Sequence, residues 1–439
     1  MSFSRQQSDA DPLLDDLNEA QRAAVTHLRG PLLILAGAGS GKTRVITRRV
    51  AFLIREGIPP RQILAVTFTN KAAAEMRERV RTLIPARGVT LSTFHSFCAR
   101  FLRAEHEALG LPATFTIFDS DDQRALVRKV LKDLGLDATY YKPADVQRRI
   151  SNAKNAGLTT EEFAEKSFGY VEQGYADSYR AYQHELRNAD AVDFDDLLLE
   201  TRRILRDHLD LRRLYQDRFR FLMVDEYQDT NRLQADIARL LAEEHGNLAV
   251  AGDPDQSIYS WRGADVDNIL GFGARWNDTK VVTLDINYRS TPTILKAADS
   301  LIANNQARLP KEMKTSNRDT GAIPVHRFVD EEAEAAWIAR YVADLRNGTA
   351  DGVTHEDGTS IFGSTGVDYD DIAVFYRTNA QSRVLELAFL SAGIPYTIVR
   401  GLEFYQRAEI KDLLAYLRVI HNPHDDLSLL RIINTPTRG

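Results

Sequence analysis

The sequence predicts an α/β protein in which parallel β-sheets are covered by helices on both faces. Three observations support this fold class. Short apolar runs alternate with helical stretches along much of the chain, and these runs are too uniformly apolar for strands with one solvated face. A glycine-rich loop follows the first run and opens a helix. The length of 439 residues allows about three domains.

Composition and charge exclude several classes of protein. Hydrophobic residues make up 44% of the chain and charged residues 27%, as in ordinary globular proteins. The net charge of -6 excludes a general polycation, so any nucleic-acid contact must be local. Cys98 is the only cysteine, which leaves neither an intrachain disulfide nor a cysteine-based zinc site. No run approaches the roughly 18 apolar residues of a membrane span. We expect a soluble, cytoplasmic protein without a membrane partner.

The first α/β domain is predicted from five apolar runs that we expect to form parallel strands. Residues 1–15 precede these runs and are predicted to be a disordered tail. Helical periodicity replaces the strand pattern between about 110 and 215, and the strand pattern resumes at 219. We therefore predict a first domain of residues 16–110 and 216–280 with a helical insertion at 111–215. The five runs are PLLILAGA (31–38), ILAVTF (63–68), VTLST (89–93), FRFLMVDE (219–226) and LAVAGD (248–253).

A second α/β series occupies residues 281–399. Its apolar runs are KVVTLDI (280–286), PVHRFV (324–329) and DIAVFY (371–376), with helices between them. The segment 347–371 is rich in Gly, Asp and Thr, which predicts a long surface loop. The pattern becomes helical again after residue 400.

The segment AGAGSGKT is a candidate phosphate-binding loop, because it follows an apolar strand and opens a helix. Small residues let successive backbone N–H groups face the phosphates. Lys42 would reach the β and γ phosphates, and Thr43 would ligate Mg²⁺. Alanine stands where the usual pattern begins with glycine, which is tolerable if that position needs no positive φ. The alternative is a strand-to-helix turn without a ligand. The loop consists of Ala36, Gly37, Ala38, Gly39, Ser40, Gly41, Lys42 and Thr43.

Two acidic residues end the fourth run of the first domain. Asp225 would hold Mg²⁺, and Glu226 would polarise the attacking water. Two acids after a strand, taken alone, indicate only a strand end, but together with the glycine-rich loop they predict an ATPase with ATP and Mg²⁺ as cofactors. The long separation between Lys42 and Asp225 agrees with an inserted domain.

Five further segments follow one another in a specific order and resemble the motif series of superfamily 1 DNA helicases, most closely the UvrD, Rep and PcrA group. The resemblance covers nearly the whole chain beyond the tail. It implies two RecA-like motor domains, the first with the helical insertion and the second incomplete, and it identifies 400–439 as the truncated start of a second helical insertion. The segments are LNEAQRAAV (17–25), AVTFTNKAAAEMRERV (65–80), STFHSFCARFL (92–102), VDEYQDTN (224–231), and GDPDQSIYSWRGAD (252–265) followed by LDINYRST (284–291).

The resemblance implies nucleotide contacts outside the loop. Gln21 matches a glutamine that reads the adenine edge, and Tyr288 matches an aromatic residue that stacks on adenine. Arg289 matches the arginine finger that reaches the γ-phosphate, and Gln256 matches a γ-phosphate sensor. Arg44 is a further candidate contact. Without the resemblance, Gln21 would be an ordinary helix-surface residue and Arg289 a solvated cation.

The resemblance also implies contacts with single-stranded DNA. Base stacking on aromatic rings contributes roughly 1–3 kcal/mol per base and tolerates any sequence, as a translocating motor requires. Core packing is the alternative for the two phenylalanines. The candidates for base contacts are Phe68, Phe194, Tyr259, Trp261 and Arg262, and the candidates for phosphate contacts are Asn70, Lys71 and His95.

Two later motifs of the family have no match. RGLEF at 400–404 imitates the TxHxAKGLEF pattern, but Thr397 occupies the histidine position, and the late arginine-rich pattern is absent. We therefore expect the N-terminal portion of a longer helicase that hydrolyses ATP poorly by itself and does not unwind DNA.

The function implied by the resemblance is ATP-driven 3′-to-5′ movement along single-stranded DNA with separation of the duplex, in repair or replication. Its partners would be single-stranded DNA, its junctions with duplex, and repair proteins, while the sequence sets no oligomeric state. Two alternatives stay open: the motor portion of a helicase-nuclease similar to RecB or AddA, and a noncatalytic module that binds nucleotide or DNA. An ATPase acting on a protein or metabolite would leave Trp261 and Arg262 unexplained.

Overall fold

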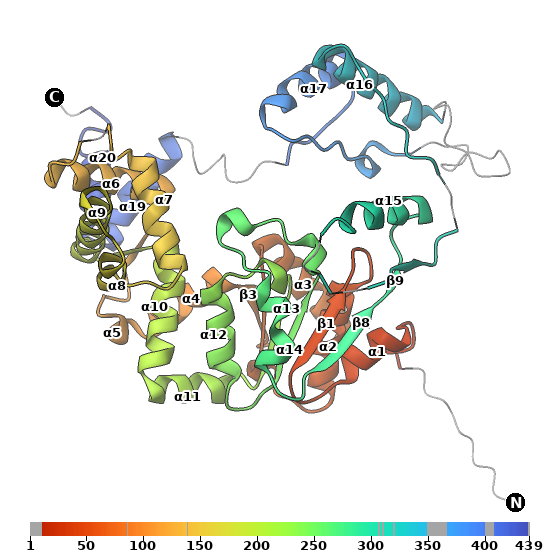
Figure 1. Ribbon diagram of the computed structural model, residues 1–439, viewed down its shortest axis with the longest axis horizontal. Coiled ribbons are helices and arrows are strands. Elements are labelled where there is room, and N and C mark those ends of the chain that lie inside the picture. Colours follow the sequence, from red (N-terminus) through yellow and green to blue (C-terminus); the bar gives the residue numbers. More distant parts are fainter. Residues whose placement is uncertain are drawn as a thin grey trace, which may run out of the picture. The chain divides into compact units, whose positions relative to one another are not determined.

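The computed structural model describes residues 11–437 except 86, 138, 306–307, 310, 319–320, 349–366 and 400–407. The chain divides into two compact units (Figure 1). The first unit contains residues 1–285, 307–311 and 405–439, and the second contains residues 286–306 and 312–404.

The first unit is built on a parallel sheet (Figure 1). This sheet has six strands in the order β3-β2-β6-β7-β1-β8. Its presence confirms the predicted α/β class, and five of its strands lie in the five apolar runs of the first domain. The strands are β1 (Leu32–Ala36), β2 (Ile63–Thr67), β3 (Thr90–Thr93), β6 (Phe221–Val224), β7 (Leu248–Gly252) and β8 (Lys280–Leu284).

Alternate side chains of each strand enter two different apolar cores. Leu33 and Leu35 belong to one core, and Leu32 and Ile34 belong to the other. Because both faces of the sheet are covered, the inner strands β1, β6 and β7 are apolar throughout, whereas the edge strands β3 and β8 also carry polar residues. The first core is closed by α4 (Phe94–Ala104), α10 (Phe194–Asp207), α11 (Leu209–Arg218) and α12 (Arg232–Ala242), and the second by α1 (Glu19–Thr26), α2 (Lys42–Arg55) and α3 (Asn70–Leu83).

The assignment of residues 281–285 to the second domain was wrong. Strand β8 lies at the edge of the first sheet and pairs with β1, from Lys280 opposite Leu32 to Leu284 opposite Ala36. The apolar pattern predicts a strand but not its neighbour, because pairing joins segments that lie far apart in the sequence. The two units meet in the sequence between Asp285 and Ile286.

The segment predicted as a helical insertion is mostly helical, and its bounds as a domain stay a prediction. It has its own apolar core, formed around Phe118, Tyr179 and Tyr182, and it also contains a parallel pair of short strands that the sequence did not predict. Helices α10 and α11, placed in the insertion at 111–215, instead close the core of the main sheet. The insertion consists of α6 (Ser120–Asp133), α7 (Pro143–Asn155), α8 (Thr160–Glu165), α9 (Tyr170–Asn188) and the strands β4 (Thr116–Phe118) and β5 (Ala191–Asp193).

Two C-terminal helices pack against this insertion. They are α19 (Ala408–His421) and α20 (Asp426–Ile432), and both belong to the first unit. The Arg418 guanidinium lies 2.7 Å from the Asp122 carboxylate, and Asn422 Nδ2 donates to the carbonyl oxygen of Ala189 at 2.9 Å. The predicted helical character after residue 400 is therefore seen from residue 408, and residues 400–407 lie outside the described part.

The second unit contains few regular strands. Strand β9 (Ile286–Asn287) pairs with β10 (Lys314–Thr315). The strands predicted at 324–329 and 371–376 are absent from the described residues, since these segments have no strand partner, and Val325 and Phe375 are 91% and 93% exposed. The loop predicted at 347–371 lies mostly outside the described residues. The main helices are α15 (Pro292–Ile302), α16 (Glu331–Asn347) and α17 (Ala380–Ser391).

The prediction of a disordered tail at 1–15 was wrong for its last five residues. Residues 11–15 form a turn in which Leu13 is buried, and Arg48 Nη1 donates to the Leu13 carbonyl oxygen at 2.7 Å. Residues 1–10 lie outside the described part. Among the described helices, none combines the length and apolar character that crossing a membrane requires.

Candidate functional site

The loop between β1 and α2 is folded tightly around two glycines. Gly39 and Gly41 have φ values of +68° and +85°, which favour glycine. A Cβ atom on Gly41 would also lie 2.9 Å from Nε2 of Gln21. Ala36 ends β1 without a positive φ, so alanine is compatible with the first position of the motif. Helix α2 begins at Lys42, which places its unpaired N–H groups at the loop.

Gln21 fixes this loop to α1. Its side chain is buried, its Nε2 donates to the carbonyl oxygen of Ser40 at 2.9 Å, and its Oε1 accepts the Asn18 N–H at 3.2 Å. Ser40 Oγ in turn donates to the Gly37 carbonyl oxygen at 2.7 Å. Through this bond to Ser40, Gln21 holds the candidate phosphate-binding loop against α1. Its predicted contact with an adenine edge stays a prediction.

Three charged side chains meet where β1 and β6 end. Lys42 forms an ion pair with Glu226, and Asp225 accepts the Glu226 N–H at 3.0 Å. Burial raises the pKa of Asp225 to about 6, while Lys42 opposes this rise and Glu226 adds to it. Glu226 has a φ of +52°, a backbone conformation that costs a non-glycine residue about 1–3 kcal/mol and is concentrated at functional sites.

The oxygen donors at this position fit a divalent cation. Asp225 is 5% exposed and its burial disfavours the charged form, so a divalent cation beside it would stabilise the carboxylate. Thr43 lies in the first turn of α2 and offers a hydroxyl oxygen. Mg²⁺ prefers oxygen ligands and retains several waters. Asp225 and Thr43 are therefore the residues that would hold it.

Gln228 joins the acidic end of β6 to the end of β7, and the sequence analysis missed it. It is 1% exposed; its Nε2 donates to Glu226 Oε2 at 2.8 Å, and its Oε1 accepts the Asp253 N–H at 3.0 Å. A Cβ atom on Gly252 would lie 2.4 Å from that Oε1, so glycine makes room for it. A glutamine two residues after the acidic strand end was the available signal.

The acidic turn after β7 is ion-paired by two cations from a distant part of the chain. Lys311 pairs with Asp253 and, at 2.9 Å, with Asp255, while Arg308 lies 3.1 Å from Asp255. Gln256 Nε2 donates to Asp253 Oδ2 at 2.6 Å. The predicted γ-phosphate sensor is therefore attached to the residue that Gln228 holds, although its contact with a phosphate stays a prediction. Sequence spacing could not reveal Arg308 and Lys311.

Four of the predicted DNA contacts form a continuous surface, which we call the aromatic strip: Phe68, Tyr259, Trp261 and Arg262. The rings of Phe68 and Tyr259 are 4.8 Å apart, and those of Tyr259 and Trp261 are 6.3 Å apart. The Arg262 guanidinium lies 4.6 Å from the Trp261 ring. Trp261 is 72% exposed, which excludes a core role for it. The strip follows the ends of β2 and β7.

The remaining DNA candidates lie at helix starts. Phe194 opens α10, is 46% exposed, and meets the His95 ring edge-on at 6.2 Å. Burial lowers the pKa of His95, so its ring is neutral near pH 7 and offers a phosphate no charge. Asn70 Oδ1 accepts the Ser96 hydroxyl at 3.4 Å, and Lys71 is exposed in the first turn of α3. The DNA roles stay predictions.

The other predicted nucleotide contacts have protein partners or lie in the second unit. The Arg44 guanidinium pairs with the Asp16 carboxylate. Tyr288 and Arg289 follow β9 in the second unit, where the Asn287 side chain accepts the Arg289 N–H at 2.8 Å. Tyr288 is 50% exposed. Their roles at the nucleotide stay predictions.

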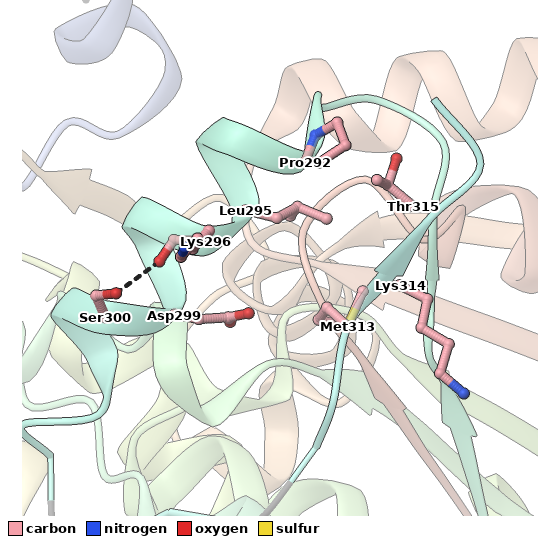
Figure 2. Close-up of a pocket in the computed structure, with 8 residues that line it drawn as sticks. All are labelled: Pro292, Leu295, Lys296, Asp299, Ser300, Met313, Lys314 and Thr315. Atoms are coloured by element: carbon pink, nitrogen blue, oxygen red, sulfur yellow. Dashed lines mark hydrogen bonds between the residues drawn. The ribbon is translucent and has the colours of Figure 1, made fainter. Parts of the chain in front are cut away.

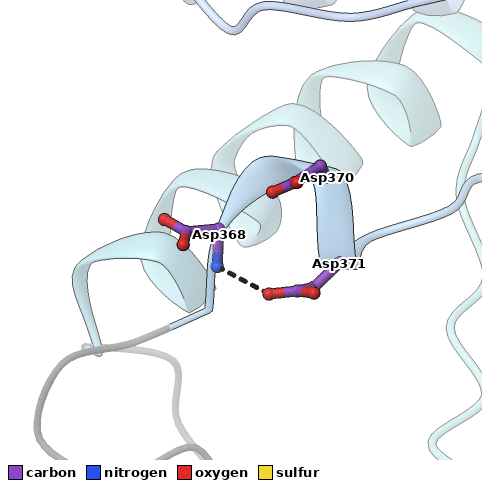
Figure 3. Close-up of side chains that lie close together, drawn as sticks. All are labelled: Asp368, Asp370 and Asp371. Atoms are coloured by element: carbon purple, nitrogen blue, oxygen red, sulfur yellow. Dashed lines mark hydrogen bonds between the residues drawn. The ribbon is translucent and has the colours of Figure 1, made fainter.

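Two other features of the second unit contain none of the predicted site residues. A pocket lies between α15 and β10 (Figure 2), where Ser300 Oγ donates to the Lys296 carbonyl oxygen at 2.8 Å. Three exposed carboxylates, those of Asp368, Asp370 and Asp371, gather at one turn (Figure 3). Asp371 accepts the Asp368 N–H at 3.2 Å, so the cluster caps its own turn.

Comparison with known proteins identifies the family. Residues 17–277 match the UvrD/REP helicase N-terminal domain, and residues 282–439 match the UvrD-like helicase C-terminal domain. The chain is 44% identical, over 97% of its length, to proteins named ATP-dependent DNA helicase PcrA from Staphylococcus aureus and Bacillus subtilis. It spans 57% and 56% of the length of these relatives. The resemblance predicted from the order of the motifs is confirmed: the chain belongs to the UvrD/REP helicase family.

Proposed function

We propose that the chain is the motor part of an ATP-dependent DNA helicase that couples ATP hydrolysis to 3′-to-5′ movement along single-stranded DNA. One observation carries this proposal: two features lie at the strand ends of the same sheet. They are the candidate phosphate-binding loop with its acidic partners and the aromatic strip. An ATPase without a nucleic-acid substrate has no use for the strip. The relatives named DNA helicases support the same conclusion.

The ion pair between Lys42 and Glu226 gives the nucleotide site a switch. An incoming triphosphate competes for the Lys42 ammonium, because phosphate oxygens carry more charge than one carboxylate. Loss of its partner leaves the Glu226 carboxylate free to accept a proton from an attacking water. Mg²⁺, when bound, would neutralise charge on the phosphate oxygens. Glu226 is thus active as a base only when nucleotide holds Lys42.

Gln228 offers a route from this switch to the DNA surface. Any movement of the Glu226 carboxylate pulls on Gln228 Nε2, and Gln228 Oε1 holds the backbone of Asp253. Gln256 and Tyr259 follow Asp253 within six residues, which span at most about 20 Å. A change at the phosphate therefore has a short path to the aromatic strip.

The aromatic strip explains how an acidic protein binds a polyanion. Stacking on Tyr259 and Trp261 requires no base sequence and no high positive charge. Arg262 adds one local cation beside the bases. The proposed substrates are single-stranded DNA and its junctions with duplex, in repair or replication, and repair proteins are proposed partners. The nucleotide contacts of Gln21, Arg44, Gln256, Tyr288 and Arg289 rest on the family resemblance.

The test is ATP hydrolysis by the purified chain, titrated with a 20-residue oligothymidylate. Wild-type turnover should rise with DNA, and Lys42→Ala should remove turnover with and without DNA. Trp261→Ala should weaken DNA binding roughly 5- to 150-fold, from the loss of about 1–3 kcal/mol of stacking, and leave ATP affinity unchanged. Tyr140→Ala is the matched control, because Tyr140 is equally exposed at 72% but lies in the insertion. Turnover that ignores DNA would contradict the proposal.

A further inference from the structure

Asn155 lies where the helical insertion meets the main sheet, where it hydrogen-bonds to two separate segments and lies beside a third. It is the last residue of α7. Its Oδ1 accepts from Asn231 Nδ2 at 2.7 Å, and its Nδ2 donates to Asp195 Oδ1 at 2.8 Å. A Cβ atom placed on Gly263 would lie 3.8 Å from the Asn155 Cβ, so a third segment passes close to Asn155.

The direction of these hydrogen bonds is fixed by the backbone. Asn231 caps α12: its Oδ1 accepts the Gln234 N–H at 2.9 Å, so its Nδ2 must face Asn155. The Asn155 amide must therefore turn its oxygen to Asn231 and its nitrogen to Asp195, which can only accept. The Asn155 side chain is thus held in one orientation from both sides.

Asn231, at one end of this chain of hydrogen bonds, lies in the segment that carries the acidic residues of the candidate nucleotide site. Asn231 closes the segment that begins with Asp225, Glu226 and Gln228. The preceding residue, Thr230, accepts the Asp265 N–H at 3.0 Å, just beyond the aromatic strip. Gly263, the glycine beside Asn155, directly follows Arg262 of that strip.

The other end belongs to the start of α10, which carries Phe194. Asp193 caps this helix and accepts the Asp196 N–H at 2.8 Å. Lys154, the neighbour of Asn155, contacts both carboxylates at 2.7 and 2.8 Å. The end of α7 therefore holds the first turn of α10 at three carboxylates, and Phe194 projects from that turn.

We propose that Asn155 is a positioning residue that couples the nucleotide site to the DNA-facing ring of Phe194. The inference rests on the proposed function, because it assumes that ATP and single-stranded DNA are the two ligands. A shift of the segment 225–231 moves Asn231, and the half-buried Asn155 amide transmits the shift to Asp195 because an amide that loses its partner away from bulk water is costly. Coupling of this kind is reciprocal: ATP changes DNA affinity by the same factor as DNA changes ATP affinity.

The experiment measures the dissociation constant of a fluorescent 16-residue oligothymidylate with and without a non-hydrolysable ATP analogue. The ratio of the two constants is the coupling factor, which typically lies between about 5 and 150 for coupled sites. Asn155→Ala removes the bonds to Asn231 and Asp195, together with the bond that Asn155 Nδ2 donates to the Ser151 carbonyl oxygen at 2.9 Å within α7. Asn155→Asp keeps the acceptor for Asn231 but sets a carboxylate against Asp195 and the Ser151 carbonyl oxygen, so of the two bonds between segments it breaks only the one to Asp195. Asn152→Ala is the matched control, because Asn152 is an exposed asparagine of the same helix.

Both Asn155 variants should bring the coupling factor to within about twofold of 1, while ATP affinity without DNA stays within about twofold of wild type. Asn231→Ser keeps the helix cap but not the bond to Asn155, and adding it to Asn155→Ala should change nothing further. Wild-type coupling in the Asn155 variants would overturn the inference alone. A wild-type protein without DNA binding or coupling would overturn the proposed function with it. Equal losses of ATP and DNA affinity would show a merely structural role.

Discussion

Two lysine–carboxylate clusters in the first unit have similar chemistry and opposite surroundings. The open cluster is Lys42 with Asp225 and Glu226, and the sealed cluster is Lys154 with Asp193 and Asp196. In the open cluster the side chains of Lys42 and Glu226 are 12% and 35% exposed. In the sealed cluster no side chain is more than 2% exposed. The same residue types are therefore accessible to a ligand in the open cluster and stabilise the fold in the sealed cluster.

The difference follows from where each lysine can go. Lys42 stands beside a glycine-rich loop, so its ammonium can exchange a carboxylate for a phosphate. Lys154 is enclosed: Tyr182 donates to Asp193 at 2.9 Å and Gln183 Nε2 to Asp196 at 3.2 Å, and no solvent reaches the ammonium. Burial by itself would lower the pKa of Lys154, but the two carboxylates outweigh it and raise the pKa. The two clusters therefore differ in whether solvent or a ligand can reach the lysine, and not in the types of charged residue that they contain.

The largest expected effect is on stability, from Lys154→Met. Methionine keeps most of the volume but leaves Asp193 and Asp196 buried without a cation, and breaking a buried pair in this way costs about 3–5 kcal/mol. Urea unfolding should show this loss in the free energy of unfolding. A change below about 1 kcal/mol would mean that water reaches the sealed cluster after all.

The same substitution in the open cluster should act mainly on turnover. Lys42→Met leaves Glu226 partly solvated but also removes the cation that lowers the pKa of the buried Asp225, so the free energy of unfolding should fall by about 1–2 kcal/mol, less than for Lys154→Met. DNA-stimulated ATP hydrolysis should fall roughly 10²- to 10³-fold, the usual cost of removing one group that stabilises transition-state charge. Unfolding and turnover measured on both methionine variants give a crossed comparison. Equal destabilisation of the two variants would remove the distinction between the clusters.

Local sequence was sufficient to predict one cluster and insufficient for the other. Lys42, Asp225 and Glu226 each end or follow an apolar run, and parallel strands bring their carboxyl ends to one edge of a sheet. Lys154 lies inside an ordinary helical pattern, and its partners are about forty residues away. Nothing in its spacing distinguishes it from a solvated lysine. Burial, which decides its role, is set by tertiary packing.

The same physical reason explains the other differences between sequence and structure. The run 280–284 was correctly predicted as a strand, but its pairing with β1 depends on a partner about 250 residues earlier. The cations Arg308 and Lys311 reach the acidic turn from 53 and 58 residues away. In the sequence, Asn155 shows only the features of a residue at the end of a helix. Motif order predicted the family, whereas the contacts between motifs required coordinates.

The smallest expected effect concerns surplus negative charge at the sealed cluster. Asp195 adds a third carboxylate beside one lysine; burial raises its pKa to about 6, the charge of Asp193 adds to the rise, and the bonds from Ser151 and Asn155 oppose it. The native protein then binds this proton more tightly than the unfolded chain, whose aspartate has a pKa near 3.8. The stability contributed by Asp195 is therefore fully present below pH 3.8 and is lost as the pH rises through 6.

Asp195→Asn isolates this contribution, because asparagine can still accept from Asn155 but carries no titrating proton. One pKa unit corresponds to about 1.4 kcal/mol, and partial exposure of Asp195 reduces the two-unit shift to an expected change of about 1 kcal/mol. The free energy of unfolding of wild type minus that of the variant should fall by this amount between pH 4.5 and 7.5 in urea titrations. A difference that does not change with pH would mean that the lysine and its hydrogen bonds neutralise all three carboxylates. The charge of the sealed cluster would then be balanced, as the proposed nucleotide site balances the charge of the open cluster when its ligand is bound.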